Sequence, residues 1–246
     1  MSDQWKTALA AGIAGAILAA VAVFGAAMLG LFPPPSDRQF ESYLMSHPSI
    51  ILAMADKAQL DEAASEERAL QSAVDKIGLK TYLTSKAAFV VGPSNAKNSI
   101  VEFFDYNCVH CRNSYPAVRK LYQTRRSDTR FVFFEFPIFG KASERAARAA
   151  LAARRQPDKY VAFHFALMGE NGEIGESQIA DAAQKSGIDL TKLATDMTDP
   201  NLDRQITAAH ALAERTGVTG TPFFIIDGKA HEGEIDDALL KKLIRS

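Results

Sequence analysis

The residues most able to do chemistry in this chain are its only two cysteines, Cys108 and Cys111, which two other residues separate. With no further cysteine in the sequence, neither can belong to a framework of structural disulfides. The short spacing lets the two thiols bond to each other and open again. A dithiol that alternates between these states is a redox reagent. The run Cys108-Val109-His110-Cys111 therefore predicts thiol-disulfide exchange.

The cysteines fall between a predicted strand and a predicted helix. The run Ile100–Tyr106 is apolar on both faces, which is typical of a buried central strand in a parallel or mixed sheet. Asn107 is expected to cap the following helix, whose apolar residues recur at helical spacing (Tyr115, Val118, Leu121, Tyr122). Cys108 would then lie at the helix N-terminus, where free amide hydrogens and the helix dipole lower the pKa of a thiol.

The two thiols are expected to differ. Cys111 lies nearly one helical turn beyond Cys108 and should be less exposed. His110 adds a hydrogen-bond donor and, when protonated, a positive charge beside the first sulfur. The sequence thus predicts that Cys108 attacks and Cys111 resolves.

Glu102 is an unusual residue for its surroundings, because it interrupts a strand made otherwise of Ile, Val and Phe. Burial of a carboxylate is costly, so its pKa should be raised. An acid in that state can exchange a proton with Cys111 as the disulfide opens and closes. The alternative is that the strand end is solvated and Glu102 points into water.

A Cys-x-x-Cys pair can also bind metal. A zinc site normally needs two more ligands at motif spacing, whereas no second cysteine pair exists and the remaining histidines are scattered (His47, His164, His210, His231). A module that holds copper(I) without thiol exchange is the alternative from another functional class. The leading prediction includes no metal and no cofactor.

A glycine-rich loop lies far downstream of the cysteines. Residues Gly217–Pro222 lead into the apolar run Phe223–Ile226, and Asp227-Gly228 is a hairpin-turn signal. Pro222 is placed at the first residue of a strand, where proline is common. The sequence alone does not predict whether the Thr221–Pro222 bond is cis.

Together, the segments Glu102–Cys111 and Gly217–Asp227 resemble the DsbA-like thiol-disulfide oxidoreductases of the thioredoxin superfamily. The resemblance covers about residues 86–246. It implies an α/β thioredoxin fold with a helical insertion at about residues 141–205. It also implies that the enzyme acts on polypeptides and needs no cofactor.

The resemblance implies a role for each site residue. Cys108 would be the nucleophile, Cys111 the resolving cysteine, His110 the group that stabilises the thiolate, and Glu102 the buried acid. Thr221 and Pro222 would form a cis-Pro loop packed against the disulfide. The Thr221 backbone would pair with an extended substrate segment, as an added strand does.

Two positions depart from the family's type sequence. That sequence has Pro-His between the cysteines, where this chain has Val109-His110. Thr221, before the proline, resembles isomerase-type relatives and some DsbA-like branches more than the type oxidase. Both positions tune the reduction potential and partner choice, so they leave oxidase and isomerase open.

The N-terminal segment predicts a membrane anchor. Residues 8–32 carry no charge, and a helix of that length spans the roughly 30 Å hydrocarbon layer. A cleavable signal peptide has a shorter apolar region. We expect residues 1–35 to be an anchor with a proline spacer in a bacterial inner membrane, crossing it once, with the catalytic domain in the periplasm. The periplasmic placement follows from the redox pair.

Residues 36–85 are predicted to be helical. Their apolar positions follow a three-four spacing (Leu60, Ala63, Glu67, Leu70, Val74, Ile77), with Glu67 as an interruption. This pattern fits a short coiled-coil seam or a helix that packs on its own domain, and the spacing does not separate the two. The region also resembles the N-terminal helical segment of DsbA-like proteins that self-associate.

The remaining periodicities complete an α/β pattern. Strands are expected at 87–91 and 130–136, helices at 142–155, 158–168, 181–186, 190–197 and 202–216, a hairpin at 227–230 and a closing helix at 235–244. Arg125-Arg126 and Arg154-Arg155 are expected on solvated faces. A net charge of −1 and a pI of about 6.5 argue against nucleic acid as a partner.

The leading functional prediction is an oxidase that transfers the Cys108–Cys111 disulfide to reduced, extended polypeptides and is re-oxidised by a DsbB-like membrane partner. The alternative enzyme is an isomerase or reductase that acts on misoxidised chains. It would self-associate through residues 37–83 and be kept reduced by a DsbD-like membrane partner.

Overall fold

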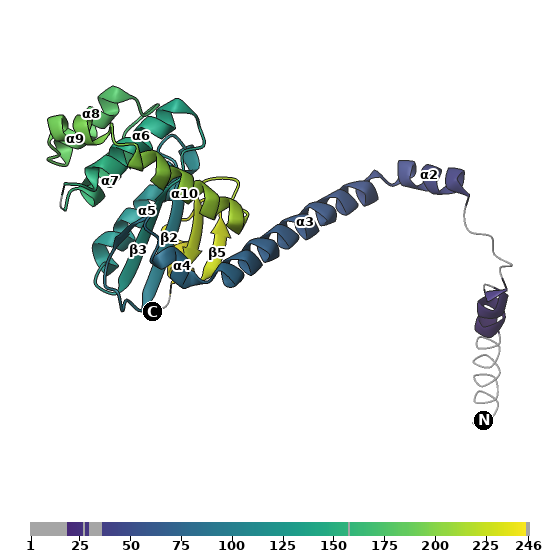
Figure 1. The fold of residues 1–246 in the computed structure, drawn as a ribbon. Coiled ribbons are helices and arrows are strands. Elements are labelled where there is room, and N and C mark those ends of the chain that lie inside the picture. Colours follow the sequence, from purple (N-terminus) through teal and green to yellow (C-terminus); the bar gives the residue numbers. More distant parts are fainter. Residues whose placement is uncertain (1–18, 27, 30–35, 157, 245–246) are drawn as a thin grey trace. The chain divides into compact units, whose positions relative to one another are not determined.

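The computed structural model describes residues 19–26, 28–29, 36–156 and 158–244. The chain divides into two compact units, Met1–Asp61 and Glu62–Ser246. The first unit contains α2 (Asp37–Ser46) and the beginning of α3 (Pro48–Ile77). The second contains the sheet and the helices around it (Figure 1).

The structure corrects the predicted membrane anchor and, with it, the predicted inner-membrane location. Among the residues that the structure describes, no helix is both long enough and apolar enough to cross a membrane. The predicted span covers residues 8–32. Residues 8–18, 27 and 30–32 of that segment lie outside the described residues.

The second unit is built on a five-stranded mixed sheet of order β1-β3-β2-β4-β5. Its strands are β1 (Phe89–Val91), β2 (Asn98–Phe104), β3 (Thr129–Glu135), β4 (Phe223–Ile226) and β5 (Lys229–Glu232). β2 pairs in parallel with β3 and antiparallel with β4, so it is central, and all seven of its residues are buried. The prediction of a buried central strand in a mixed sheet is confirmed.

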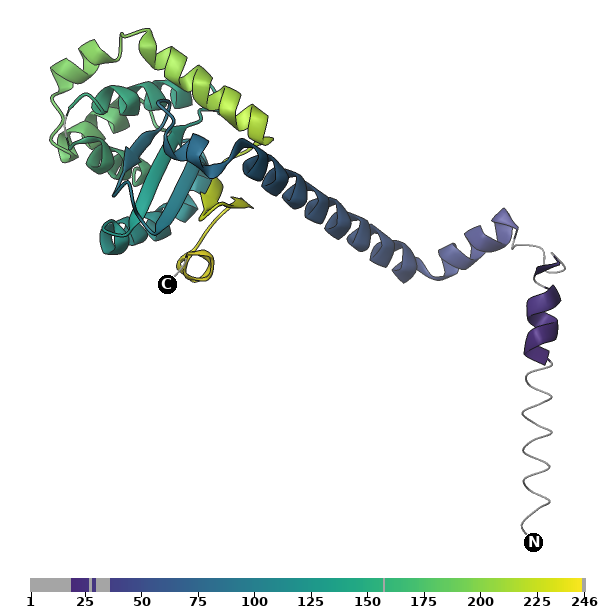
Figure 2. The ribbon, with the colours of Figure 1, turned by 60° about the horizontal axis from the view of Figure 1, so that its bottom comes forward.

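Each face of the sheet carries its own apolar core, as the alternation of side chains along a strand requires. One face presents Ile100 and Phe104 to α5 (Val109–Arg125), α7 (Tyr160–Met168) and α11 (Asp237–Leu243). The other presents Val101 and Phe103 to α10 (Asn201–Thr216), α4 (Leu79–Leu83) and the end of α3. The sheet is therefore covered by helices on both sides (Figures 1 and 2).

The end of α3 packs on its own unit. Val74 is buried, and Leu70 and Ile77 pack against the same core, whereas Leu60 is 71% exposed. Of the two interpretations of the apolar spacing, packing on the same domain holds for residues 70–77. The physical reason is that the sheet face beside α4 and α10 is apolar, and packing of the end of α3 on it removes that surface from water.

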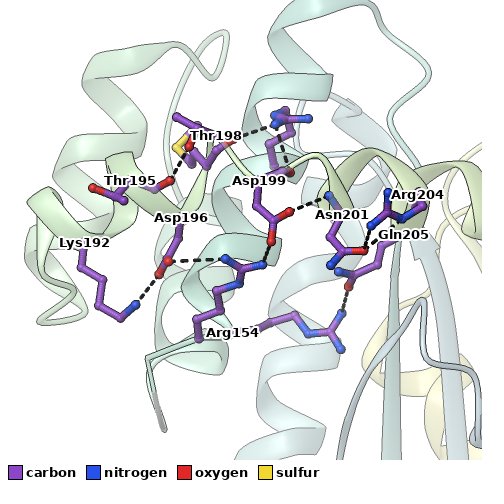
Figure 3. A network of polar contacts seen from close by, with 12 residues as sticks. Arg154, Lys192, Thr195, Asp196, Thr198, Asp199, Asn201, Arg204 and Gln205 are labelled. Atoms are coloured by element: carbon purple, nitrogen blue, oxygen red, sulfur yellow. Dashed lines mark hydrogen bonds and ion pairs between the residues drawn. The ribbon is translucent and has the colours of Figure 1, made fainter.

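Four helices intervene between β3 and α10, namely α6 (Lys141–Ala153), α7, α8 (Glu176–Lys185) and α9 (Leu190–Asp196). A polar network lies between the end of α6, α9 and α10. Asp196 accepts hydrogen bonds from Lys192 and Arg155, and Arg154 donates to Gln205 (Figure 3).

The expectation that Arg154-Arg155 lies on a solvated face holds for Arg155, which is exposed, but not for Arg154, which is partly buried. Besides its bond to Gln205, Arg154 donates to the Ala88 carbonyl at 2.8 Å and lies over the Phe89 ring. Arg155 also pairs with Asp199. Arg154 therefore connects the end of α6 to β1 and α10, whereas Arg155 forms ion pairs at the surface.

Candidate active site

The cysteine pair lies where β2 gives way to α5, as predicted. Cys108 is the N-cap of α5, with extended backbone (φ −80°, ψ 119°), and both cysteines are free and buried. The prediction that Asn107 caps the helix is wrong. Its side-chain oxygen accepts the Ile174 amide at 2.7 Å and its amide donates to Ser143 at 3.2 Å, so Asn107 holds the strand end to the inserted helices instead.

The loop before β4 meets the first sulfur. Cys108 Sγ lies 3.2 Å from the Thr221 carbonyl oxygen, and the Thr221–Pro222 peptide bond is cis. The structure thus brings Thr221 and Pro222 together with Cys108 across 113 positions of sequence.

The two thiols have opposite electrostatics. A hydrogen bond from Cys111 lowers the pKa of Cys108 to about 5, helped by the Thr221 side chain and by the backbone amides of Cys111 and His110, and opposed by burial. The pKa of Cys111 is raised well above the usual thiol value by burial, by its bond to Cys108 and by the charge of Glu102. Near neutral pH, one sulfur is an anion and the other keeps its proton.

Glu102 is buried beside this pair. It is 3% exposed and stands between Phe133 of β3 and Phe224 of β4 in the strand register. Burial, with a smaller effect from Cys108, raises its pKa to about 8. The alternative of a solvated strand end does not hold for this residue.

His110 points outward. Its side chain is 62% exposed, and Nδ1 lies 2.5 Å from Oε1 of Glu234, in the loop between β5 and α11. The hydrogen bond to Glu234 is the main cause that raises the pKa of His110, and the Cys108 charge adds to it. Sequence reasoning missed Glu234, because nothing in local spacing links positions that lie 124 residues apart.

A second buried acid lies on the same face of the sheet. Glu135 Oε1 accepts from Tyr160 at 2.9 Å and from Tyr106 at 3.4 Å, and its Oε2 is buried without a hydrogen-bond partner in the described structure. Tyr106 also lies 3.0 Å from His164 Nδ1. Burial raises the pKa of Glu135 well above its usual value and lowers that of His164 to about 3. The sequence signal for Glu135 was an acid within a predicted apolar strand, as for Glu102.

Metal ligands do not gather at the pair. Within the described ranges, no group of three or more His, Cys, Asp or Glu side chains could hold an ion. What the site combines is an ionisable thiol, a protonated partner thiol and a buried acid. That combination supports nucleophilic exchange at sulfur with a proton source for the leaving group.

Comparison with known proteins identifies related sequences and structures. The family model described as "DSBA-like thioredoxin domain" matches residues 99–245. A thioredoxin-like oxidoreductase from Silicibacter pomeroyi DSS-3 is 37% identical, with 68% of this chain and 95% of that chain covered and a TM-score of 0.62. The thiol-disulfide exchange protein alpha-DsbA2 from Wolbachia pipientis is 28% identical, with 72% and 95% covered and a TM-score of 0.65. These likenesses confirm the predicted thioredoxin fold of DsbA-like type.

The curated relatives are longer than the matched region. The DsbA of Bordetella parapertussis is 26% identical over 137 residues, which are 54% of this chain and 65% of that protein. The Na(+)/H(+) antiporter NhaA 1 of Salinispora arenicola is 28% identical over 159 residues, which are 64% of this chain and 24% of the antiporter. The chain thus spans about a quarter of the length of the antiporter and under two thirds of that DsbA.

Proposed function

Because the chain belongs to the DSBA-like thioredoxin domain family, we propose that it is a protein disulfide oxidoreductase that introduces disulfides into reduced polypeptides through Cys108 and Cys111. Substrates would be extended chains that carry two free thiols. No metal or organic cofactor takes part in the proposed reaction.

One observation carries the proposal, which is the unequal state of the two thiols. The pKa of Cys108 lies at about 5, while that of Cys111 is raised. A stabilised Cys108 thiolate favours the reduced protein, and this makes the oxidised protein a strong disulfide donor. The same stabilisation makes Cys108 the better leaving group when the mixed disulfide is resolved by substrate.

The reaction follows from this inequality. A substrate thiolate attacks Cys108 Sγ of the oxidised protein, the Cys108–Cys111 bond breaks, and Cys111 leaves as a thiolate. A second substrate thiolate then attacks the substrate sulfur of the mixed disulfide, and Cys108 leaves as a thiolate. Two electrons pass from the substrate dithiol to the protein, and the substrate gains one disulfide.

Glu102 would exchange a proton with the buried thiol of Cys111. With a pKa of about 8, it holds a proton at neutral pH within an apolar surrounding. It can give that proton to the Cys111 thiolate as it leaves and regain it when the protein is re-oxidised. We assign Glu102 this role because the two groups interact: when Glu102 is ionised, its charge raises the pKa of Cys111.

The Thr221–Pro222 loop would hold the substrate. The Thr221 carbonyl lies 3.2 Å from Cys108 Sγ, so a chain that pairs with this backbone as an added strand brings its own sulfur to Cys108. The reduced protein would then be re-oxidised by a DsbB-like partner, which closes the cycle.

The test compares the full chain with Cys108→Ser and Cys111→Ser on a reduced peptide that contains two cysteines. Cys108→Ser should reduce oxidation to the uncatalysed background. Cys111→Ser should stop turnover of the reduced peptide. When the same peptide is supplied in its disulfide form, the Cys108 thiolate of this variant should attack it and accumulate as a mixed disulfide, visible by mass. Bound copper at one equivalent without any exchange would instead support the metal-binding alternative.

An isomerase or reductase that acts as an oligomer is the second candidate. The observation that favours it lies in the first unit, where large apolar side chains are exposed (Phe40, Tyr43, Met45, Ile51, Leu52, Met54, Leu60). Exposed apolar surface of this kind is typical of protein contacts. Sedimentation of the full chain beside Leu52→Glu measures self-association. The resting redox state of the pair in cells separates a donor, which is kept oxidised, from an isomerase, which is kept reduced.

A further inference from the structure

The segment Gly233–Ile235 lies between the two halves of the site. The Gly233 amide donates to the Pro222 carbonyl at 3.0 Å, and the Ile235 amide donates to Ser114 Oγ of α5 at 3.0 Å. Gly233 has a φ of +92°, a conformation that L side chains rarely adopt, and this turn directs the next residue toward α5. One short segment thus contacts both the cis-Pro loop and the cysteine-bearing helix.

Glu234 is the charged residue of this segment. Its Oε1 accepts from His110 Nδ1 at 2.5 Å and from Asn113 Nδ2 at 2.8 Å. His110 and Asn113 are three positions apart on α5 and therefore share one helix face. The carboxylate fixes the orientation of the imidazole and holds a proton on Nδ1.

We propose, on the premise of the function proposed above, that Glu234 is a positioning residue that acts through His110: its carboxylate keeps the imidazole protonated beside Cys108 and so strengthens the protein as a disulfide donor. Nothing in the family resemblance assigns a role to this carboxylate. The inference rests on the bond geometry and on the position of the His110 main chain, whose amide is directed to Cys108 at the start of α5.

The charged groups that face His110 come from two elements. On its own helix the group is Cys108, whose anionic form raises the pKa of His110. From the loop between β5 and α11 it is Glu234, whose own pKa is lowered by His110 and Asn113. His231 of β5 contacts only the main-chain carbonyl of Glu234, at 3.2 Å.

The direction of the expected shift in the Cys108 pKa follows from two charge interactions, that of Glu234 with His110 and that of His110 with Cys108. Without the Glu234 charge, His110 loses its proton at a lower pH, because its cationic form has lost its partner. The Cys108 thiolate then lacks a neighbouring cation, so the pKa of Cys108 rises. The reduced protein becomes less favoured by about tenfold for each unit of that rise, at pH values above the Cys108 pKa.

The experiment uses Glu234→Gln in the full chain, because glutamine still accepts from His110 and Asn113 but carries no charge. The His110 ring protons are titrated by NMR, the Cys108 thiolate by its ultraviolet absorbance, and the disulfide equilibrium is measured against glutathione. We expect a lower His110 pKa, a higher Cys108 pKa and a weaker donor. Asp237→Asn, which removes the Lys120 pair between the start of α11 and α5, is the matched control and should shift none of the three.

A double-mutant cycle with His110→Asn decides whether the effect passes through the imidazole. In that background Glu234→Gln should leave the Cys108 pKa unchanged. An equal Cys108 shift with and without His110, or an unshifted His110, would overturn the inference. The NMR titration needs no exchange activity, so a wild-type protein that fails to equilibrate with glutathione while His110 still shifts would overturn the proposed function and support the Glu234 contact.

Discussion

Three carboxyl groups around the dithiol differ only in their surroundings, and this difference separates their chemistry. Glu102 is buried among apolar side chains, Glu135 is buried with two tyrosine hydroxyls, and Glu234 is exposed and paired with His110. Burial raises the pKa of the first two, whereas the hydrogen bonds of the third lower its pKa. A proton store, a structural acid and an anion thus arise from one side-chain type.

The prediction at this scale concerns Glu102→Gln in the reduced protein. Between pH 4.5 and about 8, native Glu102 keeps a proton that the unfolded chain releases. The wild type therefore loses stability as the pH rises through this window, by up to about 5 kcal/mol. Glu102→Gln removes this loss, so its stability relative to wild type should increase with pH, as measured by urea unfolding at pH 4.5 and pH 8. A difference that stays constant across the window would mean that Glu102 is ionised in the native state.

Among the elements, the edge strand β5 needs protection, because an uncovered edge exposes unpaired backbone groups. Gln71 of α3 provides it. Its Nε2 donates to the Gly228 carbonyl at 2.9 Å and its Oε1 accepts the Ala230 amide at 2.9 Å. One side chain therefore repeats the bonding pattern of a neighbouring strand, and it links α3 to the hairpin that precedes the segment 233–235.

Gln71→Ala should remove both bonds at once. We expect a loss of about 1–3 kcal/mol in unfolding free energy, since two half-buried backbone groups lose their partners. The local measurement is the rate of hydrogen exchange at the Ala230 amide. This rate should be higher in Gln71→Ala than in wild type, while the amides of the neighbouring strands keep their rates. Asp75→Ala is the control, because Asp75 bonds Gln71 from within α3 and does not contact β5. Equal exchange rates at Ala230 in wild type and Gln71→Ala would show that Gln71 does not protect the edge.

The same scale shows what sequence could and could not predict. The strand before Cys108, the helix after it and the hairpin at Asp227-Gly228 follow from periodicity and turn chemistry, which are local. Glu102 was recognisable because an acid in an apolar strand is itself a local conflict. The Asn107 side chain and the Arg154 guanidinium were misjudged, since their partners, Ile174 and Ala88, lie 67 and 66 positions away. Glu234 belongs to the same class, because only the tertiary fold brings it to His110.

At the scale of the whole molecule, the fold couples the redox state to stability. Cys108 lies at the junction of β2, α5 and the loop before β4, so any free energy stored in its thiolate is part of the folding free energy of the reduced protein. The disulfide form has no thiolate and cannot gain from this contact. The donor strength of the oxidised protein and the extra stability of the reduced protein are therefore the same quantity measured in two ways.

The last prediction uses this equivalence. The native pKa of Cys108 is about 5 and its ordinary value is 9.0, so between these limits the unfolded reduced chain holds a proton that the native one has released. Stability of the reduced protein gains from this group as the pH rises from 5 to 9, and the gain is lost as the pH falls through 5. Over the same pH window, ionisation of Glu102 lowers the stability of the protein and cancels part of this gain. Because Glu102 is present in both redox forms, the gain from Cys108 remains in the difference between them.

The difference in Tm between reduced and oxidised protein should consequently widen with pH, and 1 kcal/mol corresponds to about 2–4 °C in a chain of this size. Thermal unfolding of both forms at pH 5, 7 and 9 measures it. Cys111→Ala, which retains Cys108 as a lone thiol and has no donor at position 111, should lose part of the gain, because the Cys111 hydrogen bond is its largest cause. A gap that does not change with pH would place the Cys108 pKa at its ordinary value and remove the basis for a strong donor.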